Sequence, residues 1–316
     1  MNFNFATQFG KSEFPNPIFT ASGCAGSGKE LAQFFDLREL GAVVTKSIMR
    51  KPRSGRPTPR MAETPSGMLN SIGLQGPGIE EFLAHDIPWL KAHDSRIIVS
   101  IAGETIEDYA FLAKRLNSVA GISALEVNIS CPNVENRGQV FSCDPVTAAA
   151  AIDAVRRNIS GTMPIIAKLS PDVTDIAAIA ESCVTAGADA LALINTLLGM
   201  VIDTNTMLPK LGGKTGGLSG PAIRPIAVRA IYQVRARLPH IGILGMGGVS
   251  NGNDALEMVL AGANGISVGT ATFGNPTAPV EIKNELENLL ISKGFDSFAE
   301  AVGFAHRDPS ANRSKN

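Results

Sequence analysis

The residues best suited to chemistry lie in one short stretch, from Glu126 to Asn133, where an apolar run leads into a cluster of polar groups. Asn128, Ser130, Cys131 and Asn133 arrive within six positions of one another. A cysteine thiol can act as a base or a nucleophile, and amide side chains can hold a planar polar ligand. The stretch therefore predicts a strand that ends at a reactive site.

Two lysines bring positive charge to similar positions. Lys168 lies within an apolar run that predicts a buried strand, and Lys46 follows another such run. A buried lysine is costly unless it is paired with negative charge. Lys168 could therefore form a Schiff base with a substrate, a structural ion pair, or the counter-charge to an anionic cofactor.

Glycines after two later strands indicate a phosphate site. Gly245-Met-Gly-Gly248 follows one apolar run, and Gly269-Thr270 follows the next. Bare backbone amides at such turns bind phosphate in barrels of alternating strands and helices. Simple turn chemistry is the alternative. Because adjacent loops both carry the pattern, we favour phosphate.

The elements that must position these residues alternate between strand and helix. Eight short apolar runs are typical of strands covered on both faces, at 18–21, 42–45, 96–101, 124–128, 164–169, 190–195, 241–245 and 265–268. Helical patterns follow at 28–39, 78–92, 104–117, 144–159, 172–186, 221–238, 251–261 and 279–292. This alternation predicts an α/β protein, a single (β/α)8 TIM barrel over residues 1–307.

Segments outside this alternation have their own expected places. Three long connections, at 46–77, 129–143 and 196–220, are expected to form a lid, because barrel enzymes keep their active sites at the carboxyl ends of the strands. A short N-terminal hairpin is expected within residues 3–14, plugging the bottom of the barrel. The polar tail 308–316 is expected to be disordered.

Bulk properties exclude several classes of protein. The net charge of -1 argues against a general nucleic-acid or membrane-surface binder. No secretory signal pattern is present and no apolar run approaches the ~20 residues that span a bilayer, so we expect a cytoplasmic protein. Cysteines and histidines are scattered, which predicts no metal site. Cys183 is expected in the core, and Cys24 and Cys143 are expected to be structural.

The motifs together resemble a known family. Asn-Ile-Ser-Cys-Pro-Asn-Val (128–134) is similar to the active-site loop of class 1 dihydroorotate dehydrogenases, FMN-containing barrel flavoproteins of pyrimidine biosynthesis. Asn-Ser-Ile-Gly-Leu-Gln (70–75), Ala-Lys-Leu-Ser-Pro (167–171) and Gly-Met-Gly-Gly-Val (245–249) occur in the family's order. The resemblance spans about residues 1–290.

The resemblance implies an oxidoreductase that converts dihydroorotate to orotate in UMP biosynthesis. Cys131 would be the base that removes the C5 proton, and FMN would accept the hydride from C6. Lys46 would bridge flavin and substrate, and Lys168 would stabilise the reduced flavin. The implied substrate-binding residues are Lys46, Asn70, Ser71, Ile72, Gly73, Leu74, Asn128, Asn133, Asn195 and Thr196. The implied FMN-binding residues are Ser22, Gly23, Lys46, Ser47, Ser100, Asn128, Lys168, Ile194, Gly220, Gly247, Gly248, Gly269 and Thr270.

The subclass sets the electron acceptor. Glu-Thr-Pro-Ser-Gly-Met-Leu-Asn (63–70) and Ile-Asn-Thr-Leu (194–197) resemble the B type. Its catalytic subunit passes electrons to NAD+ through a partner that carries FAD and a 2Fe–2S cluster. This implies one FMN per chain, and a homodimer or a heterotetramer with that iron–sulfur flavoprotein. The chain has neither an NAD fingerprint nor cluster cysteines, so NAD+ use would require the partner. Ser100 departs from the pattern, since the B type commonly has asparagine there, near the flavin.

Four alternatives stay open at this point. The first is an A-type dihydroorotate dehydrogenase, a homodimer that uses fumarate. The second is an enzyme like dihydropyrimidine dehydrogenase, which shares the cysteine loop but need not accept a carboxylate. The third is a Schiff-base aldolase acting through Lys168. The fourth is a sensor of a phosphate-bearing ligand that kept the barrel without the chemistry.

Overall fold

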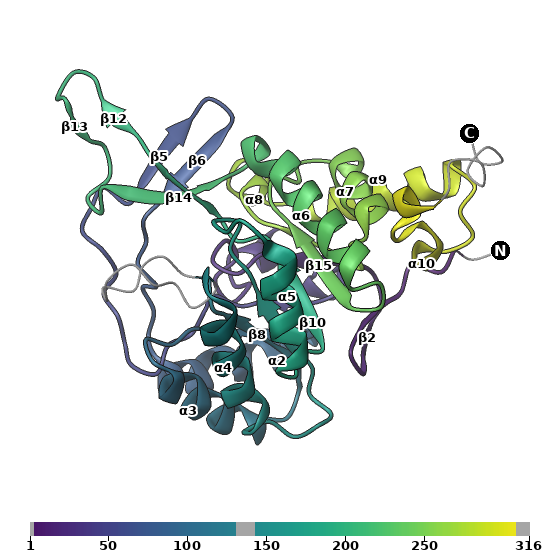
Figure 1. Cartoon of the computed structure of the whole chain (residues 1–316), viewed down its shortest axis with the longest axis horizontal. Helices are drawn as coiled ribbons and strands as arrows, with labels where there is room; N and C mark the ends of the chain where they lie inside the picture. The colour runs from purple at the N-terminus through teal and green to yellow at the C-terminus, as the bar shows by residue number, and fades with distance from the viewer. Residues whose placement is uncertain (1–2, 131–142, 308–316) are drawn as a thin grey trace.

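Eight parallel strands form the largest sheet of the protein, whose computed structural model describes residues 3–130 and 143–307. The strands follow one another around the sheet in chain order, and a parallel bridge between Phe19 and Ala42 brings the two edge strands together. This is the predicted (β/α)8 barrel (Figure 1). Its strands are β3 (Ile18–Thr20), β4 (Val43–Val44), β7 (Ile97–Ile101), β8 (Ile122–Asn128), β9 (Ile165–Lys168), β10 (Ala190–Leu193), β15 (Gly242–Met246) and β16 (Gly265–Val268).

The barrel strands are buried on both faces, which explains their continuous apolar sequences. Every residue of β7, β9, β10 and β16 is buried. Outward-facing residues pack under the helices, and inward-facing residues fill the barrel interior. Alternate residues of one strand therefore point to the same face of the sheet. Ala124 lies in the interior cluster, and Glu126 and Asn128 follow it on the same face.

Seven of the eight predicted helical patterns are helical in the structure, and these helices surround the barrel (Figure 1). The pattern at 78–92 is one continuous helix with a central turn of π-helix. Helix α4 begins where Asp144 accepts a hydrogen bond from the backbone of Thr147, the usual N-cap arrangement. The helices are α1 (Ile79–Glu81), η3 (Phe82–Asp86), α2 (Ile87–Ala92), α3 (Ile106–Asn117), α4 (Pro145–Arg156), α5 (Ile176–Thr185), η5 (Pro221–Ile223), α6 (Arg224–Arg237), α7 (Gly252–Ala261) and α9 (Ala278–Ser292).

The predicted helix at 28–39 is wrong. Two separate 3-10 turns, η1 (Leu31–Gln33) and η2 (Leu37–Glu39), occupy this segment. Asp36 stands between them with an extended backbone, and its carboxylate accepts a hydrogen bond from the backbone of Arg38. An aspartate that bonds to its own chain in this way competes with helix formation, so the segment starts a second turn instead of continuing the first.

The predicted N-terminal hairpin is confirmed, and it closes the bottom of the barrel. Strand β1 (Thr7–Phe9) pairs with β2 (Ser12–Phe14) across a turn at Gly10. Phe9 and Phe14 are fully buried, with ring centroids 5.7 and 5.1 Å from that of Phe19. Gly10 packs against Pro164 and Asp189, the residues just before β9 and β10, so the hairpin lies at the amino ends of the strands.

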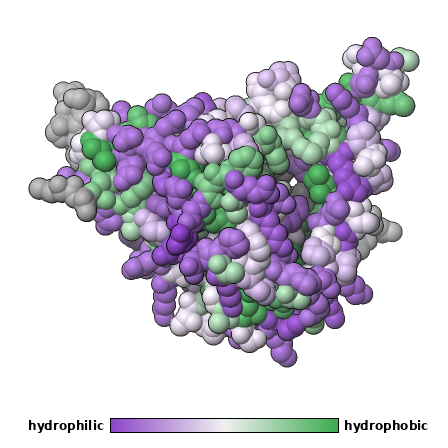
Figure 2. All heavy atoms as spheres, turned by 180° about the vertical axis from the view of Figure 1, so that it is seen from behind, coloured by the Kyte–Doolittle hydropathy of each residue, from purple (hydrophilic) through white to green (hydrophobic). Residues whose placement is uncertain are grey.

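Two of the three long connections meet above the other end of the barrel as an antiparallel sheet. The sheet combines β5 (Met61–Thr64), β6 (Gly67–Asn70), β11 (Leu197–Met200) and β14 (Thr215–Ser219). The hairpin of β12 (Ile202–Asp203) and β13 (Leu208–Pro209) projects beyond it, and carries exposed apolar side chains such as Met207 and Leu208 (Figures 1 and 2). The third connection, 129–143, lies mostly outside the described residues.

Short helices complete the described chain: α8 (Ala271–Gly274), α10 (Phe298–Ala301) and η6 (Phe304–His306). In the ranges 3–130 and 143–307, the helices are all too short or too polar to cross a lipid bilayer.

Candidate active site

The carboxyl ends of the barrel strands open into a cavity of about 600 Å³. Every barrel strand except β7 contributes a residue to its wall, either at the strand's own end or just after it. Residues from β6 and β14, in the antiparallel sheet, cover one side. The predicted site residues that line the cavity are Ser22, Gly23, Lys46, Ser47, Asn70, Ile72, Gly73, Leu74, Asn128, Lys168, Ile194, Asn195, Thr196, Gly220, Gly247, Gly248, Gly269 and Thr270.

Four predicted site residues are not part of that wall. Ser71 is fully buried behind it and accepts a hydrogen bond from Arg56 at 3.3 Å. Ser100 is also fully buried, one layer below the cavity floor. Cys131 and Asn133 lie outside the described residues, so their roles stay predictions. Cys131 comes directly after Ser130, which contacts two of the cavity amides.

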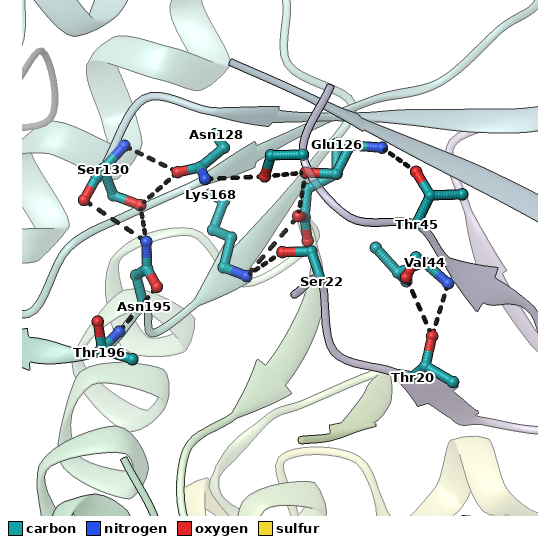
Figure 3. A network of polar contacts seen from close by, with 12 residues as sticks. Thr20, Ser22, Val44, Thr45, Glu126, Asn128, Ser130, Lys168, Asn195 and Thr196 are labelled. Carbon is teal, nitrogen blue, oxygen red and sulfur yellow. Dashed lines mark hydrogen bonds and ion pairs between the residues drawn. The ribbon is translucent and has the colours of Figure 1, made fainter. Parts of the chain in front are cut away.

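A chain of hydrogen bonds runs beneath the cavity from one amide to the next (Figure 3). The Asn195 amide nitrogen donates to the Ser130 hydroxyl at 2.7 Å, and that hydroxyl donates to the Asn128 amide oxygen at 3.0 Å. The Asn128 amide nitrogen donates to the Ser47 hydroxyl at 3.0 Å, which contacts the Ser100 hydroxyl at 2.9 Å. These bonds fix the orientation of the side chains that line the cavity.

The chain ends on a buried ion pair. The Ser100 hydroxyl donates to Oε1 of Glu126 at 2.8 Å, and the Lys168 ammonium lies 3.7 Å from the same oxygen. Lys168 also donates to the Ser22 hydroxyl at 2.8 Å. Side-chain exposure is 4% for Lys168 and 0% for Glu126, so the pair is desolvated on both sides (Figure 3). Of the three possibilities for Lys168, an ion pair is therefore realised, and the lysine still reaches the cavity wall.

Glu126 is the main residue that sequence reasoning overlooked. It stands at the head of the stretch that first suggested a site, yet no role was predicted for it. A usable signal was present, because Glu126 is the only acidic residue within the eight predicted strands. A buried lysine at position 168 needs a negative partner, and the interior of the barrel offers this one.

Glycine-rich backbone forms the part of the cavity wall that follows β15 and β16. Gly247 and Gly248 follow β15 with positive φ angles of 120° and 83°, where side chains are disfavoured. A Cβ atom on Gly248 would lie 2.7 Å from the carbonyl oxygen of Gly220, so the close approach itself requires glycine. Gly269 and Thr270 continue this wall after β16. Backbone amides at glycine-rich turns of this kind suit a phosphate group.

Cys24 also lines the cavity, although the sequence led us to expect a structural role for it. Burial raises the pKa of the Cys24 thiol, and the positive charges of Lys168 and Lys46 oppose that shift without cancelling it. Cys183 lies in the core, as expected, and burial raises its pKa to about 12. Apolar side chains supply much of the other unpredicted lining, and no residue type or spacing marked them: Met61, Met68, Ile223, Met246, Val249 and Phe273. Gln75, Ser219, Ser250 and Ser267 add polar groups that were not predicted either.

The arrangement can hold a planar polar molecule and a phosphate-bearing cofactor together. Amides and hydroxyls from Asn70, Asn128, Asn195 and Thr196 supply donors and acceptors. Lys168 supplies a positive charge next to them. Among the residues that the structure describes, no cluster of three or more histidine, cysteine, aspartate or glutamate side chains could bind a metal ion.

Comparisons with known proteins point to one family. A family model described as dihydroorotate dehydrogenase matches residues 4–290. A protein of Desulforamulus reducens is 50% identical over 97% of this chain and 100% of its own length. One from Desulforudis audaxviator is 51% identical over 92% of this chain and 94% of its own, and one from Bacillus pumilus is 48% identical over 91% and 92%. All three are named dihydroorotate dehydrogenase B (NAD(+)), catalytic subunit.

Proposed function

The chain belongs to the dihydroorotate dehydrogenase family, and we propose that it is the catalytic subunit of a B-type enzyme, which oxidises dihydroorotate to orotate for pyrimidine biosynthesis. The single observation that carries this proposal is the cavity at the carboxyl ends of the strands, which is lined by Asn70, Asn128, Asn195 and Thr196 together with the paired Lys168. The family's own substrate is a small ring with polar groups on every edge, which suits that wall.

FMN is the proposed cofactor, and the described residues fit it. Gly247, Gly248, Gly269 and Thr270 would hold its phosphate, because all four line the cavity after β15 and β16 and three of them are glycines, whose backbone amides no side chain covers. Lys168 would lie beside the ring and stabilise its negative charge after reduction. When bound, FMN would supply a hydride acceptor.

The chain's own residues would bind the substrate and move one proton. Asn70, Asn128, Asn195 and Thr196 would hold the pyrimidine ring and its carboxylate, and Asn133 would complete this set. Cys131 would accept the C5 proton, because a thiolate is a competent base when its loop shields it from water. The antiparallel sheet over the barrel mouth would exclude solvent during that transfer.

The Schiff-base alternative is disfavoured by the surroundings of Lys168. An amine must lose its proton before it attacks a carbonyl group. Here the Lys168 nitrogen is already engaged, since it donates to the Ser22 hydroxyl at 2.8 Å and lies 3.7 Å from the carboxylate of Glu126. A lysine held in this way acts better as a fixed positive charge than as a nucleophile.

A partner subunit would complete the path of the electrons. The relatives' shared name includes the words catalytic subunit, and it gives NAD+ as the acceptor. We propose that two copies of this chain form a dimer. Two copies of a partner that carries FAD and a 2Fe–2S cluster would bind this dimer to form a heterotetramer.

Reoxidation of the reduced enzyme tests the subtype. The protein is reduced with dihydroorotate without oxygen and then mixed with fumarate, a quinone, or NAD+ with and without a co-purified iron–sulfur flavoprotein. The proposal predicts fast reoxidation by NAD+ only when the flavoprotein is present. Fast reoxidation by fumarate with the chain alone would instead identify the A type.

A further inference from the structure

Glu126 has a place in the site that the binding of substrate and cofactor does not explain. Its carboxylate is fully buried and is not part of the cavity wall, so it would contact neither ligand. Its Oε1 atom receives both the Ser100 hydroxyl and the Lys168 ammonium, whereas Oε2 has no hydrogen-bond partner among the described residues. A buried ion pair adds little to stability compared with apolar packing, so stability alone does not account for this group.

The directions of the hydrogen bonds follow from which atoms can donate. The backbone nitrogen of Ser130 lies 3.3 Å from one amide atom of Asn128, and that of Thr196 lies 2.8 Å from one amide atom of Asn195. A backbone N–H only donates, so both amide atoms must be oxygens. The amide nitrogens of Asn128 and Asn195 therefore point along the chain, toward Ser47 and Ser130.

At the other end, the carboxylate sets the direction of the two serines. Ionised Glu126 only accepts, so the single hydroxyl proton of Ser100 is committed to it. Ser100 must then accept from Ser47, and Ser47 must accept from Asn128. All the bonds run one way, from Asn195 through Asn128 to Glu126, with each hydroxyl using its one proton.

We propose that Glu126 is a positioning residue that orients the substrate-binding amides through this chain of hydrogen bonds. The chain uses the Asn128 oxygen and one of its two N–H groups, and leaves the second N–H for a ligand in the cavity. A ring carbonyl oxygen of the substrate is the group that this remaining donor would bind. The inference rests on the proposed function, because orotate is the ligand with which it is tested.

Two substitutions distinguish the role of the hydrogen-bond chain from the role of the negative charge on Glu126. Ser100→Ala removes the link between Glu126 and Ser47 but keeps the ion pair with Lys168. Glu126→Gln keeps an acceptor oxygen but removes the charge. Thr20→Val is the matched control. The Thr20 hydroxyl is equally buried in the barrel, but it bonds to Val44 and takes no part in the hydrogen-bond chain.

Titration of the FMN-loaded variants with orotate, followed by the flavin absorbance, gives the decisive comparison. We expect Ser100→Ala to raise the Kd for orotate about 3- to 10-fold, the usual effect of one lost hydrogen bond, with flavin content unchanged. Anaerobic flavin reduction at saturating dihydroorotate should stay within about twofold, because the base and the flavin are untouched. Thr20→Val should leave the Kd within about twofold.

The double variant Ser100→Ala/Glu126→Gln tests whether the two residues act as one unit. We expect its Kd to be no higher than that of the weaker-binding single variant, because the first substitution already breaks the chain. A Ser100→Ala protein that binds orotate as tightly as Thr20→Val overturns the proposal. So does a double variant whose Kd rises by the product of the two single-variant factors. If Glu126→Gln does not fold, the comparison of Ser100→Ala with Thr20→Val still decides. A parent protein whose flavin does not respond to orotate would refute the proposed function instead.

Discussion

The ammonium nitrogen of Lys168 lies 3.7 Å from Oε1 of Glu126 inside the barrel, and neither side chain has appreciable contact with solvent. The two residues come from neighbouring strands, β9 and β8, whose register places Lys168 beside Asn128 and Glu126 beside Ile166. This pair connects the cavity wall with the hydrogen-bonded amides. Lys168 itself lines the cavity, and Glu126 is linked to the amides through Ser100.

Breaking this pair from one side should cost more stability than removing both charges. Lys168→Met leaves the Glu126 carboxylate buried without its partner, and we expect a loss of about 3–5 kcal/mol in the free energy of unfolding. Lys168→Met/Glu126→Gln should recover most of that loss, because no charge remains buried. Urea unfolding in flavin-free buffer measures both variants. Equal stability of the single and double variants would show that the charges are not coupled.

Gly247, Gly248 and Gly269 in the cavity wall lead to a prediction about cofactor binding. Gly248→Ala places a methyl group 2.7 Å from the Gly220 carbonyl oxygen, at a backbone angle that alanine disfavours, and we expect FMN affinity to fall about tenfold or more. Gly161→Ala is the control, because nothing lies within 4 Å of the added atom. Flavin content and FMN titration of both variants give the answer. Full FMN content in Gly248→Ala would remove this wall from the cofactor site.

The barrel could be predicted from the sequence because its strands are apolar throughout. In a sheet covered on both faces, continuous runs of valine, isoleucine, leucine and alanine mark each strand, and helical patterns separate them. The segment at 28–39 has helical composition too, but the local hydrogen bond of Asp36 overrides it. The antiparallel sheet at the barrel mouth joins segments about 150 residues apart, such as Met68 and Ser219, and such pairing leaves no local signal.

The site could be predicted where chemistry-bearing residues end a strand. Asn128, Lys168 and Asn195 are polar groups at the ends of apolar runs, and all three reach the cavity. Glu126 was missed because its partner lies on a different strand, and only the register of β8 and β9 brings the two together. Ser100 was expected at the flavin, whereas the structure places it between Ser47 and Glu126, behind the wall.

The buried thiols predict a pattern of alkylation. Burial raises the pKa of Cys183 to about 12, so this thiol stays protonated at neutral pH, whereas Cys143 is exposed. Because the folded-state pKa exceeds that of an ordinary thiol, the contribution of Cys183 to stability is complete below the ordinary pKa and is lost as the pH rises toward 12. Iodoacetamide at about pH 8 should label Cys143 and spare Cys183 until the protein is denatured. Rapid native labelling of Cys183, detected by mass spectrometry, would contradict its burial.

Cys131 carries the proposed proton transfer. Cys131→Ala should keep its flavin and bind orotate, but lose most dihydroorotate oxidation, because no group is left to accept the C5 proton. Cys131→Ser should retain slow turnover, since a hydroxyl is a much weaker acid to ionise than a thiol. Steady-state oxidation and orotate titration of the two variants measure these effects. Near-normal turnover in Cys131→Ala would assign the base to another residue.

Anaerobic mixing of the natively purified protein with dihydroorotate tests the proposed oxidation directly. We expect a yellow protein with one FMN per chain, whose flavin absorbance bleaches within the time of one catalytic turnover while an equal amount of orotate forms. Cys131→Ala, mixed in the same way, should keep its yellow colour. A colourless protein, or bound FMN that dihydroorotate leaves oxidised, would show that the chain does not oxidise dihydroorotate through FMN.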